Sequence, residues 1–184
     1  SVPATTEVIG IAAFYKNKNL ITVNINSPTT TGINPQAFKE SANLETIYMP
    51  YIKSIAASTF ADCKKLANVT MPTETIDNLG QTMFSGCSSL KSITLPKVVL
   101  ETFNASSFFA ECRALESVEL PTNTTQIGFR MFDTCKALTN LDLTKTSVEK
   151  IGSYSFMYTP VSLTIPSTVH TIETYAFTKN TGVF

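Results

Sequence analysis

Charge is scarce in this sequence, and neither sign dominates. Only 15% of its 184 residues are charged, and 14 Lys+Arg balance 14 Asp+Glu, which gives a formal net charge of zero. A protein that binds nucleic acid without sequence specificity needs a basic surplus to displace counterions from phosphates, so we expect no nucleic-acid partner. No apolar run reaches the roughly 18 uninterrupted residues of a membrane-spanning helix, and we therefore expect no such segment in this chain.

Histidine, the residue used most often for acid–base catalysis and metal binding, occurs only once, as His170. A catalytic base needs a partner that orients it, and the sequence suggests none for this histidine. The G-x-S-x-G, P-loop, H-E-x-x-H and G-x-G-x-x-G motifs are all absent. We therefore expect a protein that is not an enzyme, with no catalytic residue, no cofactor and no metal site.

What the sequence does contain is a regular series of phenylalanines, 21 to 25 residues apart. A period in this range is typical of stacked repeats, each too small to bury its own apolar face. The fifth unit is irregular, because Phe103 stands one residue before the apolar position that lies five before Phe109, and because Phe108 and Phe109 form a double phenylalanine. The members of the series are Phe14, Phe38, Phe60, Phe84, Phe109, Phe132, Phe156 and Phe177.

Each unit combines a strand pattern with a turn pattern. After the phenylalanine, an L-x-x-V-x-I stretch alternates with period two, which predicts a short strand, and a proline closes four units. Before it, apolar residues three to five apart predict one helical or 3-10 turn. Equivalent strands joined by crossovers must be parallel. We therefore predict a single domain, 1–184, of about seven 22–25-residue repeats and a truncated C-terminal unit, wound into a curved solenoid.

Two segments of the chain resemble a known repeat family. Residues 57–72 read ASTFADCKKLANVTMP, and residues 81–96 read QTMFSGCSSLKSITLP. Both are similar to the unit of the BspA-type leucine-rich repeat, roughly I-G-x-x-A-F-x-x-C-x-x-L-x-x-V-x-I-P. The resemblance implies an α/β fold: a right-handed solenoid with a parallel sheet on its concave face and short helical or 3-10 turns on its convex face. It also implies an exported bacterial surface protein, often a lipoprotein or adhesin.

The four cysteines stand three residues after successive phenylalanines, so stacking would place them in one column. Repeats about 4.8 Å apart would permit disulfides, whereas a metal site usually has closely spaced C-x₂₋₄-C pairs. Asn17, Ser41 and Asn180 occupy equivalent positions, so the position does not require sulfur. We favour buried thiols that fill space, with disulfides and a metal site as the alternatives. The cysteines are Cys63, Cys87, Cys112 and Cys135.

The outward positions of the predicted strands form two polar or amphipathic columns. In leucine-rich repeats this sheet lines the concave face, which is the usual docking surface. A solvated sheet face is also polar for structural reasons, since Ser and Thr pair well between strands, and both interpretations remain open. The candidate ligand-binding residues are Tyr48, Asn68, Thr70, Ser92, Thr94, Ser117, Glu119, Asn140 and Asp142.

Two features of this surface suggest more specific contacts. Glu119 and Asp142 should be neighbours on adjacent strands, where a cation or a basic partner group could offset their repulsion. Solvent screening together with Lys145 is the simpler explanation. Tyr48 and Tyr51 could form an aromatic spot of the kind enriched at binding hot spots. The alternative is a turn tyrosine that packs on its own loop.

The expected function is non-enzymatic recognition or adhesion at a cell surface. The partner would be a protein or a glycan on a host or neighbouring cell, bound through the concave sheet. The alternative is a structural spacer within a larger surface protein. By the family resemblance, the location would be extracellular, on the bacterial outer surface.

Overall fold

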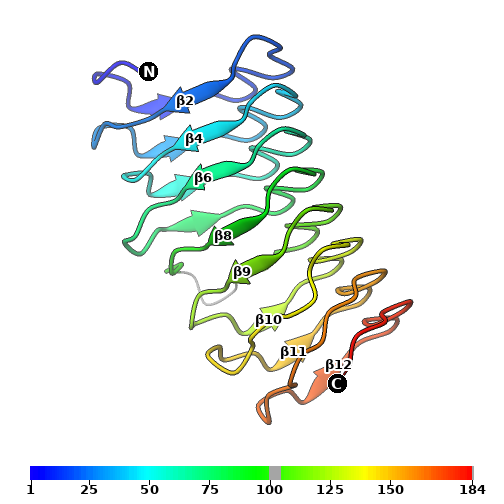
Figure 1. The fold of residues 1–184 in the computed structure, drawn as a ribbon. Coiled ribbons are helices and arrows are strands. Elements are labelled where there is room, and N and C mark those ends of the chain that lie inside the picture. Colours follow the sequence, from blue (N-terminus) through cyan, green and yellow to red (C-terminus); the bar gives the residue numbers. More distant parts are fainter. Residues whose placement is uncertain (100–104, 184) are drawn as a thin grey trace.

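The computed structural model describes residues 1–99 and 105–183, which wind into a stack of similar coils (Figure 1). Phe103 lies outside the described residues. Every strand has two or three residues, and the described part of the chain contains no helix. Accordingly, no described segment is a helix long and apolar enough to cross a membrane.

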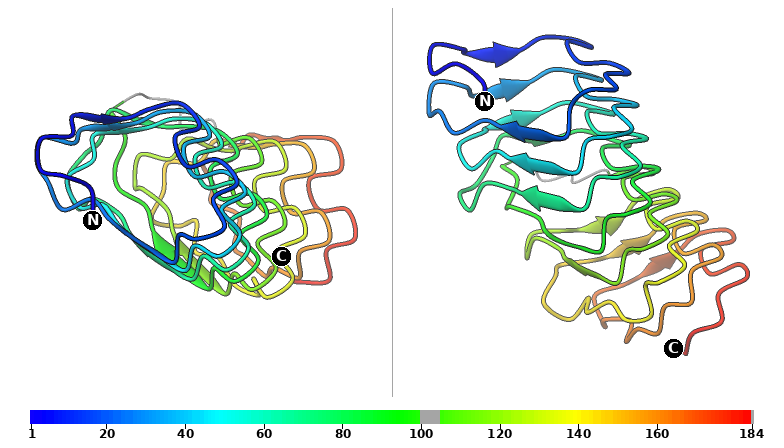
Figure 2. Two further views of the ribbon diagram at one scale, coloured as in Figure 1. Left: turned by 90° about the horizontal axis from the view of Figure 1, so that it is seen from above. Right: turned by 45° about the horizontal axis from the view of Figure 1, so that its top comes forward.

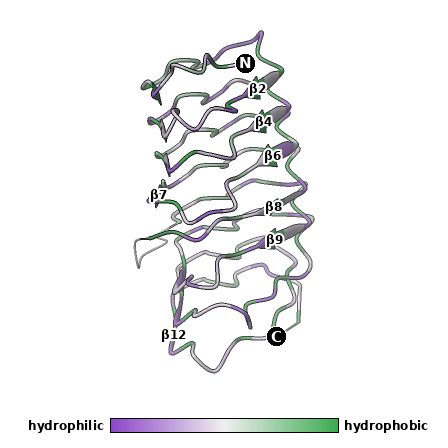
Figure 3. Ribbon diagram, turned by 90° about the vertical axis from the view of Figure 1, so that its left-hand side faces the viewer, coloured by the Kyte–Doolittle hydropathy of each residue, from purple (hydrophilic) through white to green (hydrophobic). Residues whose placement is uncertain are grey.

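Strands lie on two opposite sides of the coil (Figures 2 and 3). All their pairings are parallel, as the repeat predicts. One side holds the predicted L-x-x-V-x-I strands: β2 (Thr22–Asn24), β4 (Thr46–Tyr48), β6 (Asn68–Thr70), β8 (Ser92–Thr94) and β9 (Ser117–Glu119). The other side holds β1 (Val8–Ile9), β3 (Gly32–Ile33), β5 (Ser54–Ile55), β7 (Asn78–Leu79), β10 (Gln126–Ile127), β11 (Lys150–Ile151) and β12 (Thr171–Ile172).

The second set of strands was not predicted. Its members carry the aliphatic residue that stands five before most of the phenylalanines, as Ile55 does before Phe60. A run of two residues is too short to show the alternation that marks a strand in a sequence. The pairing of these residues therefore becomes visible only when consecutive coils are stacked.

The expected helical or 3-10 turns, and with them the α/β class, are wrong. In the arm around Phe60, the amide N–H groups of Phe60 and Asp62 donate to carbonyls of the next coil, at 3.1 and 2.7 Å. Ser58 and Asp62 have φ angles of +57° and +59°, and similar pairs recur in the other arms. A right-handed helix cannot include left-handed residues four apart. The arms are therefore chains of isolated turns, and the fold is an all-β solenoid.

The phenylalanines form one continuous stack through the core. Successive rings of the series lie 5.1 to 5.8 Å apart between centroids, with planes within 13° of parallel. Phe108 packs edge-on against Phe84 and Phe109, at interplanar angles of 71° and 73°. Offset stacking and edge contacts are the favourable arrangements of aromatic pairs. The extra phenylalanine of the fifth unit therefore lies beside the stack without interrupting it.

Candidate functional site

The predicted ligand-binding residues lie on one surface, which we call the strand face. It consists of the outward side chains of β2, β4, β6, β8 and β9 and of the equivalent stretches 140–142 and 162–164. The outer residues of the strands are mostly exposed, and the middle residue is buried or half-buried. All nine candidate residues are exposed. The inward and outward positions predicted from the sequence are therefore correct.

The strand face is divided into three separately paired groups. In the first, Tyr48 of β4 lies beside Thr70 of β6, and β2 pairs with β4. In the second, β8 pairs with β9, which places Thr94 beside Glu119. In the third, Asn140 forms a single bridge with Ser162. The predicted columns are confirmed within each group, but no described strand pairing joins one group to the next.

Backbone hydrogen bonds locate the break between the first and second groups. Within the paired groups, Met49 N–H donates to the Thr70 carbonyl at 3.1 Å, and Leu95 N–H donates to the Glu119 carbonyl at 3.0 Å. Across the described coils, the equivalent bond from Met71 to the next strand is missing. Figure 1 shows β6 and β8 farther apart than β8 and β9. The sheet is therefore open between β6 and β8 and closed on either side.

Core residues reach the surface where the sheet is open. Val69, the middle residue of β6, and Val118, the middle residue of β9, are half-buried, and each borders a break. Ile47, the middle residue of β4, has strands on both sides and is 0% exposed. Apolar side chains that an unbroken sheet would cover thus become part of the surface.

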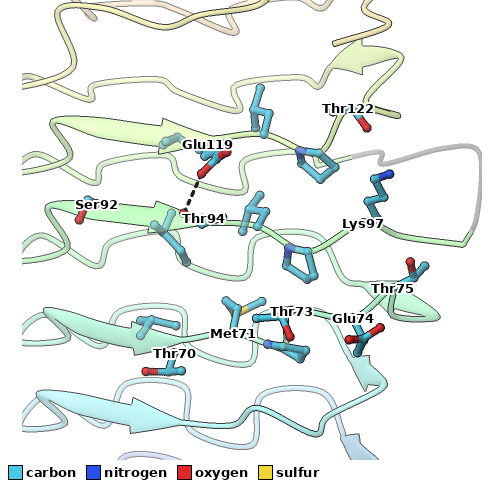
Figure 4. Close-up of a pocket in the computed structure, with 18 of the residues that line it drawn as sticks. Thr70, Met71, Thr73, Glu74, Thr75, Ser92, Thr94, Lys97, Glu119 and Thr122 are labelled. Carbon is cyan, nitrogen blue, oxygen red and sulfur yellow. Dashed lines mark hydrogen bonds between the residues drawn. The ribbon is translucent and has the colours of Figure 1, made fainter. Parts of the chain in front are cut away.

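A hollow of about 940 Å³, here called the first hollow, extends across β6, β8 and β9 (Figure 4). Its apolar lining includes Val69, Met71 and Leu95. Five of the nine predicted residues line it: Thr70, Ser92, Thr94, Ser117 and Glu119. The hollow therefore combines hydroxyl groups and a carboxylate with an apolar floor.

Sequence reasoning missed the residues that extend this hollow beyond the strands. They follow the prolines that close three consecutive units, so an exposed position just after each proline was the available signal. They contribute three threonines and two charges to the wall of the hollow. These residues are Thr73, Glu74, Thr75, Lys97 and Thr122.

A smaller hollow, of about 470 Å³, lies over the third group. It contains the predicted Asn140 and Asp142, together with residues of 162–164. Tyr48 and Asn68 are not among the described residues that line either hollow. Asn68 instead donates a 3.4 Å hydrogen bond to the Thr46 hydroxyl across the strand pair.

The two acidic residues of the strand face line different hollows. Glu119 accepts a 3.1 Å hydrogen bond from the Thr94 hydroxyl, within the first hollow. Asp142 lines the smaller hollow, where the hydroxyl and then the amide of Thr144 lower the pKa of its carboxyl group, helped by Lys145 at 3.6 Å. β9 does not pair with the stretch that contains Asp142, and the prediction that the two carboxylates are neighbours stays a prediction. The described residues contain no group of three or more His, Cys, Asp or Glu arranged to hold a metal ion.

The cysteines belong to the core. All four are buried and free, which contradicts the disulfide alternative. Each thiol donates to the carbonyl of a phenylalanine in the preceding coil, as Cys87 does to Phe60 at 3.1 Å. The Ser41 hydroxyl makes the same bond to Phe14 at 2.7 Å, so the position selects a small donor, not sulfur. Burial raises the pKa of the Cys63 thiol to about 12, and it raises the pKa of the other three cysteines as well.

The remaining candidates lie away from the hollows. His170 is exposed, with Nε2 3.6 Å from Glu149 Oε2. Tyr51, the proposed companion of Tyr48, is 50% exposed, and no ring contact joins the two among the described aromatic pairs. Neither His170 nor the pair of Tyr48 and Tyr51 therefore forms part of a described site with other candidate residues.

Comparison with known proteins gives the same repeat and the same architecture. The model of the BspA type leucine rich repeat region matches residues 1–108 and 101–183, with six copies. A search of curated protein sequences finds no match. The crystal structure of a leucine-rich repeat protein of T. pallidum is 26% identical, covers 81% of this chain and 68% of that chain, and gives a TM-score of 0.67.

Two further crystal structures align over 97% of this chain. A leucine-rich repeat protein from Bacteroides ovatus is 22% identical, with a TM-score of 0.49 and 63% of that chain covered. A leucine-rich cell surface protein from Faecalibacterium prausnitzii is 18% identical, with a TM-score of 0.45 and 75% of that chain covered. Since the family model matches almost the whole sequence and the coils repeat its unit, the chain belongs to the BspA-type leucine-rich repeat family.

Proposed function

We propose that this chain is a non-enzymatic recognition module, exported to the surface of a bacterial cell, which binds a protein or a glycan through the strand face. Leucine-rich repeat solenoids are typically interaction or surface modules without catalytic activity. The observation that carries the proposal is the first hollow, where hydroxyl groups, Glu119 and Lys97 surround the half-buried side chains of Val69 and Val118.

A strand face that is polar only because it contacts water would not need the first hollow. Within the β2–β4–β6 group, Ile47 has strands on both sides and is fully covered. Between β6 and β8 the interior is open, and keeping apolar surface exposed to water is unfavourable. A bound partner would cover the apolar floor and recover its burial energy.

The second candidate is a structural spacer that separates other parts of a surface protein. The unbroken stack of phenylalanine rings favours it, because parallel coils joined through one core make a stiff rod. A spacer needs the core but not the first hollow. Changes in the hollow therefore distinguish the two functions.

The test measures binding of the purified chain to extracellular-matrix proteins, to host and bacterial cells, and to a glycan array. The variant Ser92→Arg/Ser117→Arg places two long cations in the hollow at paired, exposed positions. The matched control, Thr22→Arg/Asn24→Arg, adds the same charges to β2 on the same face, outside the lining of both hollows. We expect the first variant to lose at least about tenfold in affinity, equivalent to about 1.4 kcal/mol, and the control to bind normally. Equal binding by the wild type and both variants would place the binding site outside the first hollow and refute the proposal as stated, and no binding by any of the three would favour the spacer.

A further inference from the structure

We infer that the first hollow binds an extended polypeptide segment, which lies along the break between β6 and β8 and places an apolar side chain against Val69 and Met71. This inference rests on the proposed recognition function and specifies its class of partner. Three features of the hollow support it: its backbone groups, its floor and the composition of its walls.

The backbone groups at the break are those that strand pairing would use. In the neighbouring pair, Met49 N–H donates to the Thr70 carbonyl at 3.1 Å. Met71 and Thr94 are the equivalent residues across the break, and the described coils contain no such bond between them. Both residues line the hollow. Strand edges with unmatched amide and carbonyl groups are templates for pairing with another chain, and an extended peptide supplies both groups in register.

The floor of the hollow suits an aliphatic or aromatic side chain. Met71 is 7% exposed and Val69 is half-buried, whereas their counterparts in β4 and just after it, Ile47 and Met49, are both 0% exposed. Methionine adapts its shape to irregular partners because its side chain is unbranched and polarizable. In a bound peptide, alternate side chains point to the same face. One residue would therefore contact the floor while its neighbours face the threonines.

The walls are better suited to a peptide than to a sugar. None of the described lining residues is aromatic, so the apolar faces of sugar rings find no ring on which to stack. Asn, Asp, Gln, Arg and His, the usual partners of neighbouring sugar hydroxyls, are likewise missing from the described lining. The lining instead holds two carboxylates and one ammonium group, those of Glu74, Glu119 and Lys97, and none of the three forms a described ion pair. Charged residues that flank the inserted side chain could pair with them.

The experiment uses a phage-displayed library of random linear peptides as the protein probe and a glycan array as the alternative. Thr94→Arg fills the hollow from an exposed position, and Thr22→Arg is the control in β2. Val69→Thr keeps the shape of the Val69 side chain but adds a hydroxyl group to the floor of the hollow. It still tests the inference if Thr94→Arg does not fold. Circular dichroism and thermal unfolding of each variant confirm that it is folded.

We expect selected peptides to share an apolar residue between β-forming residues. Thr94→Arg should weaken their binding about tenfold or more and Val69→Thr several-fold, and Thr22→Arg should leave it unchanged. Bound peptide should also slow hydrogen exchange at the Met71 amide. Methylation of the peptide's backbone nitrogens at the positions that face the break should abolish binding, whereas methylation of the alternate nitrogens should not.

Each other outcome overturns the inference in a distinguishable way. Glycans that bind in a Thr94-dependent manner, without any peptide, would leave the recognition function intact but replace the class of partner. Peptides that bind equally well to Thr94→Arg would place the site elsewhere. Self-association that Thr94→Arg abolishes would make a second copy of this chain the occupant. If neither library yields a ligand, the inference and the proposed function both fail.

Discussion

Replacing Phe84 by alanine should destabilise the protein more than the same change at almost any other position of the phenylalanine stack. Phe84 is fully buried, and its ring contacts three others: Phe60 at 5.6 Å, Phe109 at 5.8 Å and Phe108 at 5.6 Å. Phe14, near the N-terminus, is only partly buried and contacts one ring in the stack, Phe38 at 5.1 Å. The comparison of Phe84 with Phe14 therefore isolates the effect of position in the stack.

The magnitude follows from burial and from the ring contacts. A buried phenylalanine replaced by alanine costs about 3–5 kcal/mol, which includes the cavity left behind. Each aromatic pair contributes about 0.5–1.5 kcal/mol beyond burial, so the three contacts of Phe84 place its variant near the upper end, at about 5 kcal/mol. Phe14→Ala loses two fewer contacts and less burial. It should therefore cost about 2–3 kcal/mol.

Urea denaturation followed by circular dichroism gives both free energies of unfolding. Phe129→Ala provides the control, because Phe129 is 46% exposed and lies outside the stack, and it should cost about 1 kcal/mol or less. Native-state hydrogen exchange adds spatial resolution. Since each coil contacts only its neighbours, Phe84→Ala should reduce protection most in the arms around Phe60 and Phe109.

Equal costs for Phe84→Ala and Phe14→Ala, within about 0.5 kcal/mol, would refute this reasoning. In that case ring stacking would not distinguish the middle of the solenoid from its end. A loss of protection spread evenly over all coils would contradict the expected local character of the damage.

Three further predictions follow from buried or paired groups. In the unfolded chain the Cys63 thiol ionises above about pH 8.5, whereas burial raises its pKa in the folded protein to about 12. The free energy of unfolding should therefore fall as the pH rises between these two values. Urea titrations at several pH values should show that Cys63→Ser removes about 1.4 kcal/mol per pH unit from this slope. Gly80→Ala places a Cβ 2.2 Å from the Ala57 amide nitrogen and should lower the free energy of unfolding, measured in urea, by roughly 3 kcal/mol. At Gly10 an added Cβ has nothing within 4 Å, so Gly10→Ala should lower it by less than about 0.5 kcal/mol. Equal effects of the two changes would contradict the close packing at Gly80. The pKa of the Glu173 carboxyl is lowered first by the Lys150 ammonium, 2.6 Å away, and then by the Ser153 amide, so this ion pair is lost as the pH falls. An NMR titration should show that Lys150→Met raises the pKa of Glu173. An unchanged pKa would refute the role given to Lys150.

The parts of the fold that the sequence predicted correctly are those that repeat in every unit. The strand around Ile47 and the buried position of Cys63 both follow from one alignment of the units. Repetition works as evidence because each coil meets nearly the same neighbours, so one local pattern predicts many contacts. The cysteine position illustrates this, since Ser41 in the equivalent place already indicated that sulfur was not required.

The errors arose where hydrogen bonds run between coils and not within one unit. The turn around Phe60 resembles a helix in spacing, but its amides donate to the next coil, and Ser58 and Asp62 adopt left-handed φ angles. Neither feature has a residue type that reveals it, because non-glycine residues occupy both positions. The expected backbone pairing between β9 and the stretch around Asp142 is missing for a related reason: a regular column in the sequence does not show whether two strands actually bond.

The sequence by itself determined the repeat, the inward and outward assignment of each strand residue and the family of this protein. Those depend on the order of apolar and polar side chains along each unit, which is a local property. Only the tertiary structure decided that the arms are turns, that a second set of strands exists, and that the sheet opens between β6 and β8. The opening depends on how far apart two neighbouring coils settle. That separation results from many contacts summed over both coils, and no single unit of the sequence encodes it.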